Sequence, residues 1–131
     1  MMAKRPDRMK AVSIIEAAER DMKFTMTLNP TKESGATIVR NIYESFRMLG
    51  EALLTARGVR SQDHRETINE LFKIKADTPR PLHLIDSLRR LRHGINYYGY
   101  APKMEEVADA ISIAEGCFPP LLKEVRKKVN A

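Results

Sequence analysis

The sequence predicts an all-α protein, an antiparallel up-and-down bundle of about five helices. Apolar residues recur every three to four positions through five segments, the spacing that places them on one face of a helix. No segment shows the sustained alternation of apolar and polar residues that is typical of a half-buried strand. The connections between segments are short, which favours antiparallel packing of neighbouring helices. A chain of 131 residues can bury one continuous core, so we expect a single domain over residues 1–131.

The first two predicted helices have clear ends. The first covers residues 7–28 and stops before Pro30, because proline disfavours helical geometry in the residue that precedes it. The second covers residues 32–57, and Gly58 follows as the residue type that commonly ends a helix. Each helix therefore presents one apolar stripe. The stripe of the second includes Ile38, Ile42, Ser45, Phe46, Leu49, Ala52, Leu53 and Ala56.

The third predicted helix is shorter and covers residues 61–74, with Ser61 as its N-cap. Its buried side is expected to carry Ile68, Leu71 and Phe72. A loop follows over residues 75–81. The fourth helix begins near Pro81 and extends to the Tyr97-Tyr98-Gly99 stretch, after which Pro102 breaks the pattern.

The fifth predicted helix covers residues 103–130. Pro119 and Pro120 are expected to kink or interrupt it, because proline lacks the amide hydrogen and clashes with the carbonyl four residues earlier. Cys117, the only cysteine, lies in an apolar stretch of the same helix. We expect it to be a buried structural thiol rather than a nucleophile.

The charge balance favours an anionic partner. Lysine and arginine number 23 against 17 aspartate and glutamate, a net charge of +6, and such an excess attracts polyanions at long range. Solvated helix faces and termini explain the basic groups near both ends of the chain better than a nucleic-acid patch does. The charge alone therefore leaves the partner open.

Other classes of protein are not indicated by the sequence. No apolar stretch is long enough to span a membrane, and residues 1–10 lack the apolar centre of a secretion signal, so we expect a cytoplasmic protein without a membrane partner. His64, His83, His93 and Cys117 do not show the spacing of metal ligands, and no glycine-rich phosphate loop appears. We therefore expect neither a metal nor a cofactor.

One arginine of the fourth helix conflicts with the apolar pattern. When Leu88 defines the direction of the core at 100° per residue, the neighbouring apolar residues fall within about 60° of it. These residues are Leu84, Ile85, Leu91 and Ile95. Arg92 falls inside the same stripe, whereas Arg89, Arg90 and His93 project away from it and are interpreted as surface groups.

A guanidinium does not lose its charge, so Arg92 needs compensation in a core-facing position. One alternative is structural: the side chain forms an ion pair, or its stem packs while its head reaches solvent. The candidate carboxylates are Glu44, Glu51 and Asp86. The other alternative is functional: Arg92 points into a cleft or dimer seam and binds a phosphate through its bidentate fork.

Three tyrosines follow Arg92 at the end of the fourth helix. In one interpretation Tyr98 and Tyr100 fill the end of the bundle, and Gly99 ends the helix. In the other, tyrosines next to an arginine stack on nucleobases while the arginine holds a phosphate. Both interpretations remain open at this point.

Two segments together resemble the HEPN family, the higher eukaryotes and prokaryotes nucleotide-binding proteins, and in particular its small prokaryotic members. The first runs from Ile42 to Gly58 and is followed by His64, and the second runs from Leu91 to Gly99. The resemblance extends over most of the chain. It implies an antiparallel helical bundle that forms a homodimer, often with a minimal nucleotidyltransferase as partner protein. Many members are metal-independent endoribonucleases.

The family signature places a polar residue after an arginine and a histidine four to six residues further on. By this resemblance Arg92 matches the arginine and His93 the polar position. Asn96, Tyr97 and Tyr98 occupy the stretch where the final histidine belongs, so the ribonuclease motif is degenerate. The departure matters because histidine moves protons near neutral pH and tyrosine ordinarily does not.

Three hypotheses follow. The first is a HEPN-like RNA- or nucleotide-binding protein of a toxin–antitoxin-type system, with Arg92, Asn96 and Tyr97 at the ligand. The second is an active metal-independent endoribonuclease toxin, in which Arg92 stabilises charge and His93 or Tyr98 transfers a proton. The third is a non-enzymatic helical interaction module in which Arg92 closes a structural ion pair.

Overall fold

The structure, a computed structural model, describes residues 2–3, 5–60 and 63–131, and it confirms the all-α prediction. The helices within these ranges are α1 (Arg8–Thr25), α2 (Gly35–Arg57), α3 (His64–Phe72), α4 (Leu84–Tyr98) and α5 (Met104–Asn130). The strands β1 (Met2–Ala3) and β2 (Val59–Arg60) form one short antiparallel pair. Two residues are too few to leave an alternating pattern, which explains why the sequence predicts no sheet.

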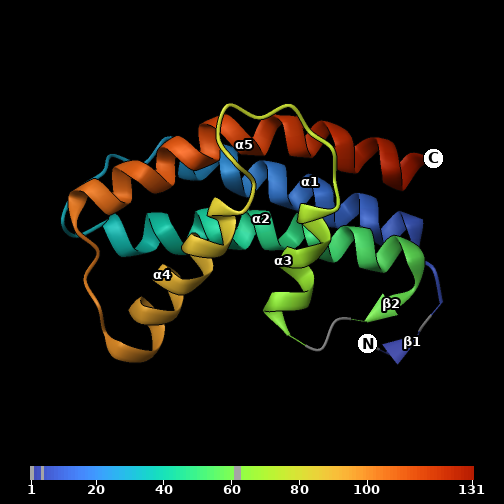
Figure 1. The fold of residues 1–131 in the computed structure, drawn as a ribbon, viewed down its shortest axis with the longest axis horizontal. Coiled ribbons are helices and arrows are strands. Elements are labelled where there is room, and N and C mark those ends of the chain that lie inside the picture. Colours follow the sequence, from blue (N-terminus) through green and yellow to red (C-terminus); the bar gives the residue numbers. More distant parts are fainter. Residues whose placement is uncertain (1, 4, 61–62) are drawn as a thin grey trace.

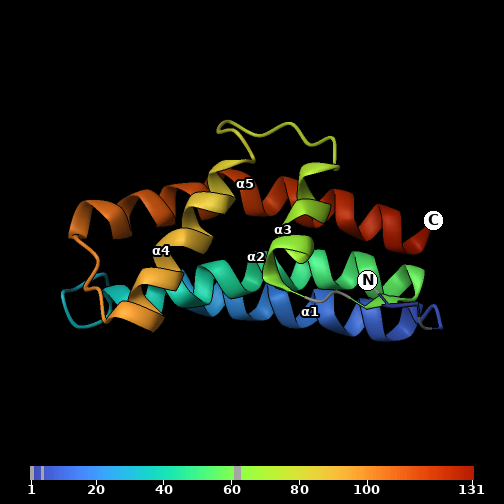
Figure 2. The same ribbon diagram turned by 60° about the horizontal axis from the view of Figure 1, so that its bottom comes forward.

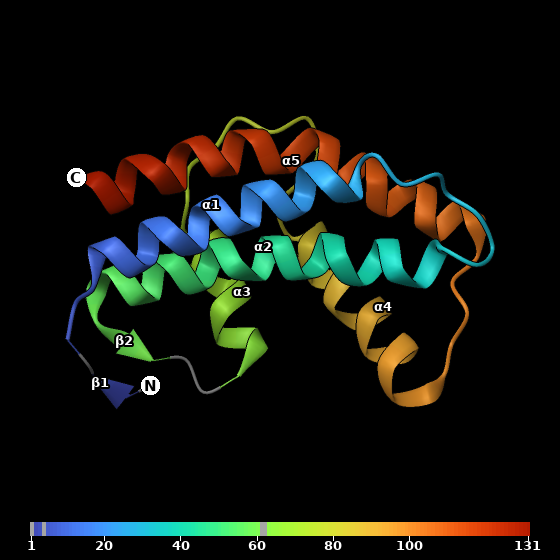
Figure 3. The same ribbon diagram turned by 180° about the vertical axis from the view of Figure 1, so that it is seen from behind.

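The long helices α1, α2 and α5 pack against one another, and the short helices α3 and α4 lie on one side of them (Figures 1 and 2). α1 and α2 form an antiparallel hairpin. α3 and α4 lie across the long helices, and α5 then runs beside α2 in the same direction as α2 (Figure 3). α2 packs against each of the other four helices and so forms the centre of the bundle. None of the helices in the described ranges is long and apolar enough to cross a membrane.

The core follows the predicted stripes. Ile38, Ile42, Phe46 and Leu49 of α2 are completely buried, and the Phe46 ring meets the ring of Phe118 on α5 edge to face at 5.5 Å between centroids. Such aromatic pairs stabilise a core beyond the area that they bury. Gly58 and Gly99 end α2 and α4 in the left-handed conformation, as predicted for Gly58 from its position.

α3 differs from its predicted form. It begins at His64, and Asp63 caps it by accepting a hydrogen bond from the backbone N–H of Glu66 at 2.9 Å. The predicted N-cap, Ser61, lies outside the described residues. Phe72 is 36% exposed rather than buried, because the chain leaves the helix there and Ile74 fills the core position instead.

α5 continues through Pro119 and Pro120, so the predicted interruption is not observed. Both neighbouring turns are anchored in the core by Phe118 and Leu121, and tertiary packing of this kind holds a helix together where local hydrogen bonds are missing. Cys117 is buried, as predicted, and burial raises the pKa of its thiol.

Two contacts hold α3 against α2. The carboxylate of Glu70, only 4% exposed, accepts hydrogen bonds from Arg57 at 2.6 Å and from Lys73 at 2.7 Å. Earlier in α2, Gly50 lies directly against the backbone of Thr67, and a Cβ at Gly50 would meet the Thr67 carbonyl oxygen at 2.1 Å. The absence of a side chain at Gly50 therefore sets how closely the two helices approach.

Candidate functional site

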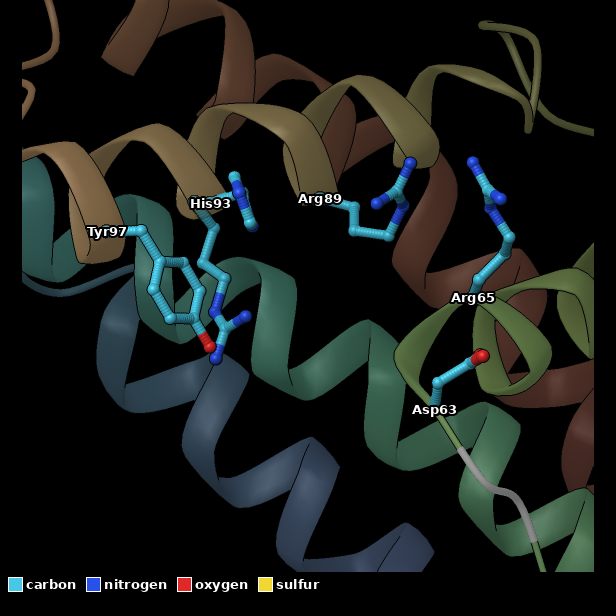
Figure 4. Close-up of a pocket in the computed structure, with 6 residues that line it drawn as sticks. Asp63, Arg65, Arg89, His93 and Tyr97 are labelled. Carbon is cyan, nitrogen blue, oxygen red and sulfur yellow. The ribbon is translucent and has the colours of Figure 1, made fainter.

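A cavity of about 450 Å³ opens between the start of α3 and the adjacent flank of α4. Its described lining consists of Asp63, Arg65, Arg89, Arg92, His93 and Tyr97. Figure 4 shows Arg89, His93 and Tyr97 along α4, facing Asp63 and Arg65 of the α3 region across the cavity. Three arginines and one carboxylate in one small space make this the strongest candidate for binding an anion.

The helical repeat of α4 places four lining residues on one flank. Arg89, Arg92, His93 and Tyr97 are spaced at i, i+3, i+4 and i+8, the positions that follow one another along the side of a helix. The adjacent face of α4 is anchored in the core by its buried residues Ile85, Leu88 and Ile95. This anchoring fixes the rotation of α4 and places the four side chains at the cavity.

Arg92 is half-buried and lies over an aromatic ring rather than beside an acid. Its Cζ atom is 5.5 Å from the ring centroid of Tyr43, a residue of α2 that is completely buried. Burial raises the pKa of Tyr43 to about 12, although the positive charge of Arg92 acts in the opposite direction. The ring is therefore neutral at physiological pH and offers the guanidinium a cation–π contact.

An ion pair of Arg92, which was one of the two alternatives, is not formed within the described residues. Two of the three candidate carboxylates, Glu44 and Glu51, lie next to Arg47 at 2.5 and 3.8 Å. The third, Asp86, binds Arg89 at 2.8 Å and lies 3.7 Å from Arg90. The positive charge of Arg92 is thus compensated by the Tyr43 ring and by solvent, and its hydrogen-bond donors remain available to a ligand.

The other charged groups of the cavity leave it positive. The hydrogen bond from Arg89 lowers the pKa of Asp86, so this pair stays ionised and holds the Arg89 side chain in place. Asp63 is committed to capping α3. Arg65 is exposed and forms no ion pair with any residue in the described ranges.

Three aromatic rings gather at the end of α4. The His93 ring lies 4.6 Å from the ring of Tyr97 and 5.8 Å from that of Tyr98, measured between centroids. Tyr98 does not line the cavity and is 80% exposed. Asn96 also lies outside the cavity lining, where its Oδ1 accepts a hydrogen bond from Nε of Arg40 on α2 at 2.7 Å.

Of the residues singled out from the sequence, the cavity brings together Arg92, His93 and Tyr97. Arg89 was interpreted as a surface charge but is half-buried and lines the cavity, and Arg65 was not singled out at all. The helical projection takes only the direction of the core into account, whereas α3, packed on α2, faces the flank of α4 across the cavity. The spacing of the polar residues along that flank was the signal that would have found Arg89.

Comparisons with protein-family models, with curated proteins and with solved structures found no match for this chain. The described fold and cavity define its class on their own: a bundle of helices with an arginine-lined cavity between the two short helices.

Proposed function

We propose that the protein binds phosphate groups of RNA or of a nucleotide in the cavity between α3 and α4. The observation that carries this proposal is Arg92, which is half-buried at the cavity, supported by the Tyr43 ring and without a carboxylate partner among the described residues. An arginine in this state presents its bidentate fork to a planar or tetrahedral anion. Arg65 and Arg89 add further positive charge on the same cavity.

The proposal agrees with two features of the sequence. The net charge of +6 favours approach of a polyanion. The resemblance to the HEPN family places Arg92 at the family's arginine, and it assigns the chain a role as a homodimer and as the HEPN partner of a nucleotidyltransferase in a toxin–antitoxin-type system. Both the dimer and the partner protein belong to the proposal.

Substitution of Arg92 tests the proposal directly. We expect Arg92→Gln to weaken binding of a short fluorescein-labelled single-stranded RNA by about tenfold to a hundredfold, because a charge-assisted hydrogen-bonding group is lost. Fluorescence anisotropy at fixed salt measures the affinity. Arg90→Gln is the matched control, since Arg90 lies on the same helix, is exposed and does not line the cavity. We expect it to change the affinity by less than about threefold.

Thermal unfolding of both variants accompanies the titration. Equal loss of affinity in Arg92→Gln and Arg90→Gln would show that RNA binding depends only on the net charge of the protein, and this would contradict the proposal. An Arg92→Gln protein that unfolds while wild-type and Arg90→Gln stay folded would instead assign Arg92 a structural role through its contact with the Tyr43 ring, and would also contradict the proposal.

A second candidate function is metal-independent RNA cleavage, and the observation in its favour is that His93 lines the same cavity as Arg92. In such a reaction the RNA 2′-oxygen forms a bond to the adjacent phosphorus while the bond to the 5′-oxygen breaks. His93 accepts the proton of the 2′-hydroxyl, water returns a proton to the 5′-oxygen, and Arg92 stabilises the charge on the phosphate. The products are a 2′,3′-cyclic phosphate and a free 5′-hydroxyl.

Incubation of the wild-type protein with RNA in EDTA tests this second candidate. If it holds, RNA ends in 2′,3′-cyclic phosphates accumulate, and His93→Ala slows their formation at least a hundredfold with little change in RNA affinity. His83→Ala is the matched control, because His83 is an exposed histidine at the start of α4 that does not line the cavity. If the wild-type protein binds RNA measurably but leaves it intact, RNA cleavage is contradicted and only the binding function stands.

A further inference from the structure

Two tyrosines stand exposed at the edge of the arginine-lined cavity. Tyr97 is 67% exposed and Tyr98 is 80% exposed, and both lie in the last turn of α4. The other two tyrosines are engaged elsewhere: Tyr43 is buried in α2, and the hydroxyl of Tyr100 donates a hydrogen bond to Glu106 at 2.6 Å. Two large aromatic side chains that are mostly in water next to a charged cavity need an explanation.

The local structure holds these two rings in place. Tyr97 packs at a tilt of 39° on the His93 ring, and Tyr98 meets the same ring near its edge at 62°. Gly99 ends the helix in the left-handed conformation, and the N–H of Tyr100 then donates to the carbonyl of Gly94 at 3.1 Å. The chain therefore turns away immediately after the tyrosines and leaves their outer faces uncovered by the residues that follow.

We propose that Tyr97 and Tyr98 form a stacking platform for unpaired bases, so that the ligand of the cavity is a single strand of RNA rather than a duplex or inorganic phosphate. This inference rests on the proposed phosphate-binding function and names its ligand class. The backbone of the strand lies at Arg92 and Arg65, and consecutive bases stack on the exposed tyrosine faces. A duplex does not fit this arrangement, because its bases are already stacked on one another.

The charge next to the platform favours a nucleic acid over a protein as the occupant. An apolar docking surface for a protein is typically depleted of charged groups at its centre. Here the tyrosines border three arginines, of which Arg65 and Arg92 form no ion pair among the described residues. Aromatic faces alternating with positive charge are the recognition chemistry of single-stranded nucleic acid.

The test compares a single-stranded oligouridylate with an abasic oligomer of the same length and phosphate count. We expect the wild-type protein to bind the oligouridylate at least tenfold more tightly, because only this ligand can stack. Tyr98→Ala is expected to lose about tenfold in affinity for the oligouridylate and nothing for the abasic oligomer, whereas Tyr98→Phe retains both affinities. Phe24→Ala is the matched control, since Phe24 is an exposed aromatic residue of α1, 62% exposed, outside the cavity.

Intrinsic fluorescence supplies a second measurement, because the chain contains four tyrosines and no tryptophan. Stacking on Tyr97 and Tyr98 should quench tyrosine emission with the oligouridylate and leave it unchanged with the abasic oligomer. Equal affinity of the wild-type protein for the two oligomers, or for a duplex of the same length, would overturn the platform while the phosphate-binding function stands. Failure to bind any of the three would overturn the phosphate-binding function itself.

Sedimentation of wild-type and Tyr98→Ala tests whether the tyrosines instead contact a second copy of the chain. A Tyr98→Ala protein that self-associates less and binds the oligouridylate as wild-type does would assign the tyrosines to a contact between copies of the chain and overturn the platform.

Discussion

Replacement of Gly50 by alanine is expected to lower the free energy of unfolding by about 3 kcal/mol or more, the upper range for overpacking a core. The new Cβ would lie 2.1 Å from the carbonyl oxygen of Thr67 and 2.9 Å from its carbonyl carbon. Both atoms belong to the backbone of α3, so no side-chain rotation relieves the overlap. α3 must move away from α2, and urea denaturation followed by circular dichroism measures the cost.

The same substitution is expected to weaken RNA binding by the molecules that stay folded, because Asp63 and Arg65 move with α3. Gly94→Ala is the control on the neighbouring helix. A Cβ there meets only Tyr100 Cβ, at an ordinary 3.7 Å, and alanine is the better helix former, so this protein should be as stable as wild-type or slightly more stable. A Gly50→Ala protein as stable as Gly94→Ala would show that α2 and α3 do not approach closely.

The helices could be predicted because local chemistry decides them. The four-residue spacing of Ile38, Ile42 and Phe46 marks the buried face of α2 whatever packs against it, and Gly58 stops the helix through its own backbone freedom. Pro119 and Pro120 show where local chemistry is not enough. Their neighbours Phe118 and Leu121 are buried, and this tertiary packing keeps α5 continuous against the local preference.

The site could be predicted only in part, for a related reason. Arg92 is recognisable because it interrupts an apolar stripe, and that property belongs to α4 alone. Arg89 and Arg65 join it only because α3 packs on α2 across the cavity from α4. This packing depends on Gly50 meeting Thr67, a contact that no helical projection contains. The contact between Tyr43 and Arg92 could not be predicted either, because nothing in the sequence of α2 indicates that a guanidinium of α4 lies over the Tyr43 ring.

Replacement of Tyr43 by alanine is expected to destabilise the protein by about 3–5 kcal/mol, the range for deletion of a completely buried aromatic side chain. The loss includes the core contacts of the ring in α2 and the support of Arg92 on α4. Thermal and urea denaturation measure the total. Tyr97→Ala removes an exposed ring from the same site and should change stability by less than about 0.5 kcal/mol.

Two milder substitutions separate these contributions. Tyr43→Phe keeps the ring beneath Arg92 and should keep the affinity for single-stranded RNA, whereas Tyr43→Leu keeps most of the apolar volume but removes the π-face. A cation–π contact contributes about 0.5–2 kcal/mol, so we expect Tyr43→Leu to bind RNA about twofold to thirtyfold more weakly than Tyr43→Phe. Equal affinities would show that the Tyr43 ring fills space only, and Arg92 would then be held by the packing of its own helix.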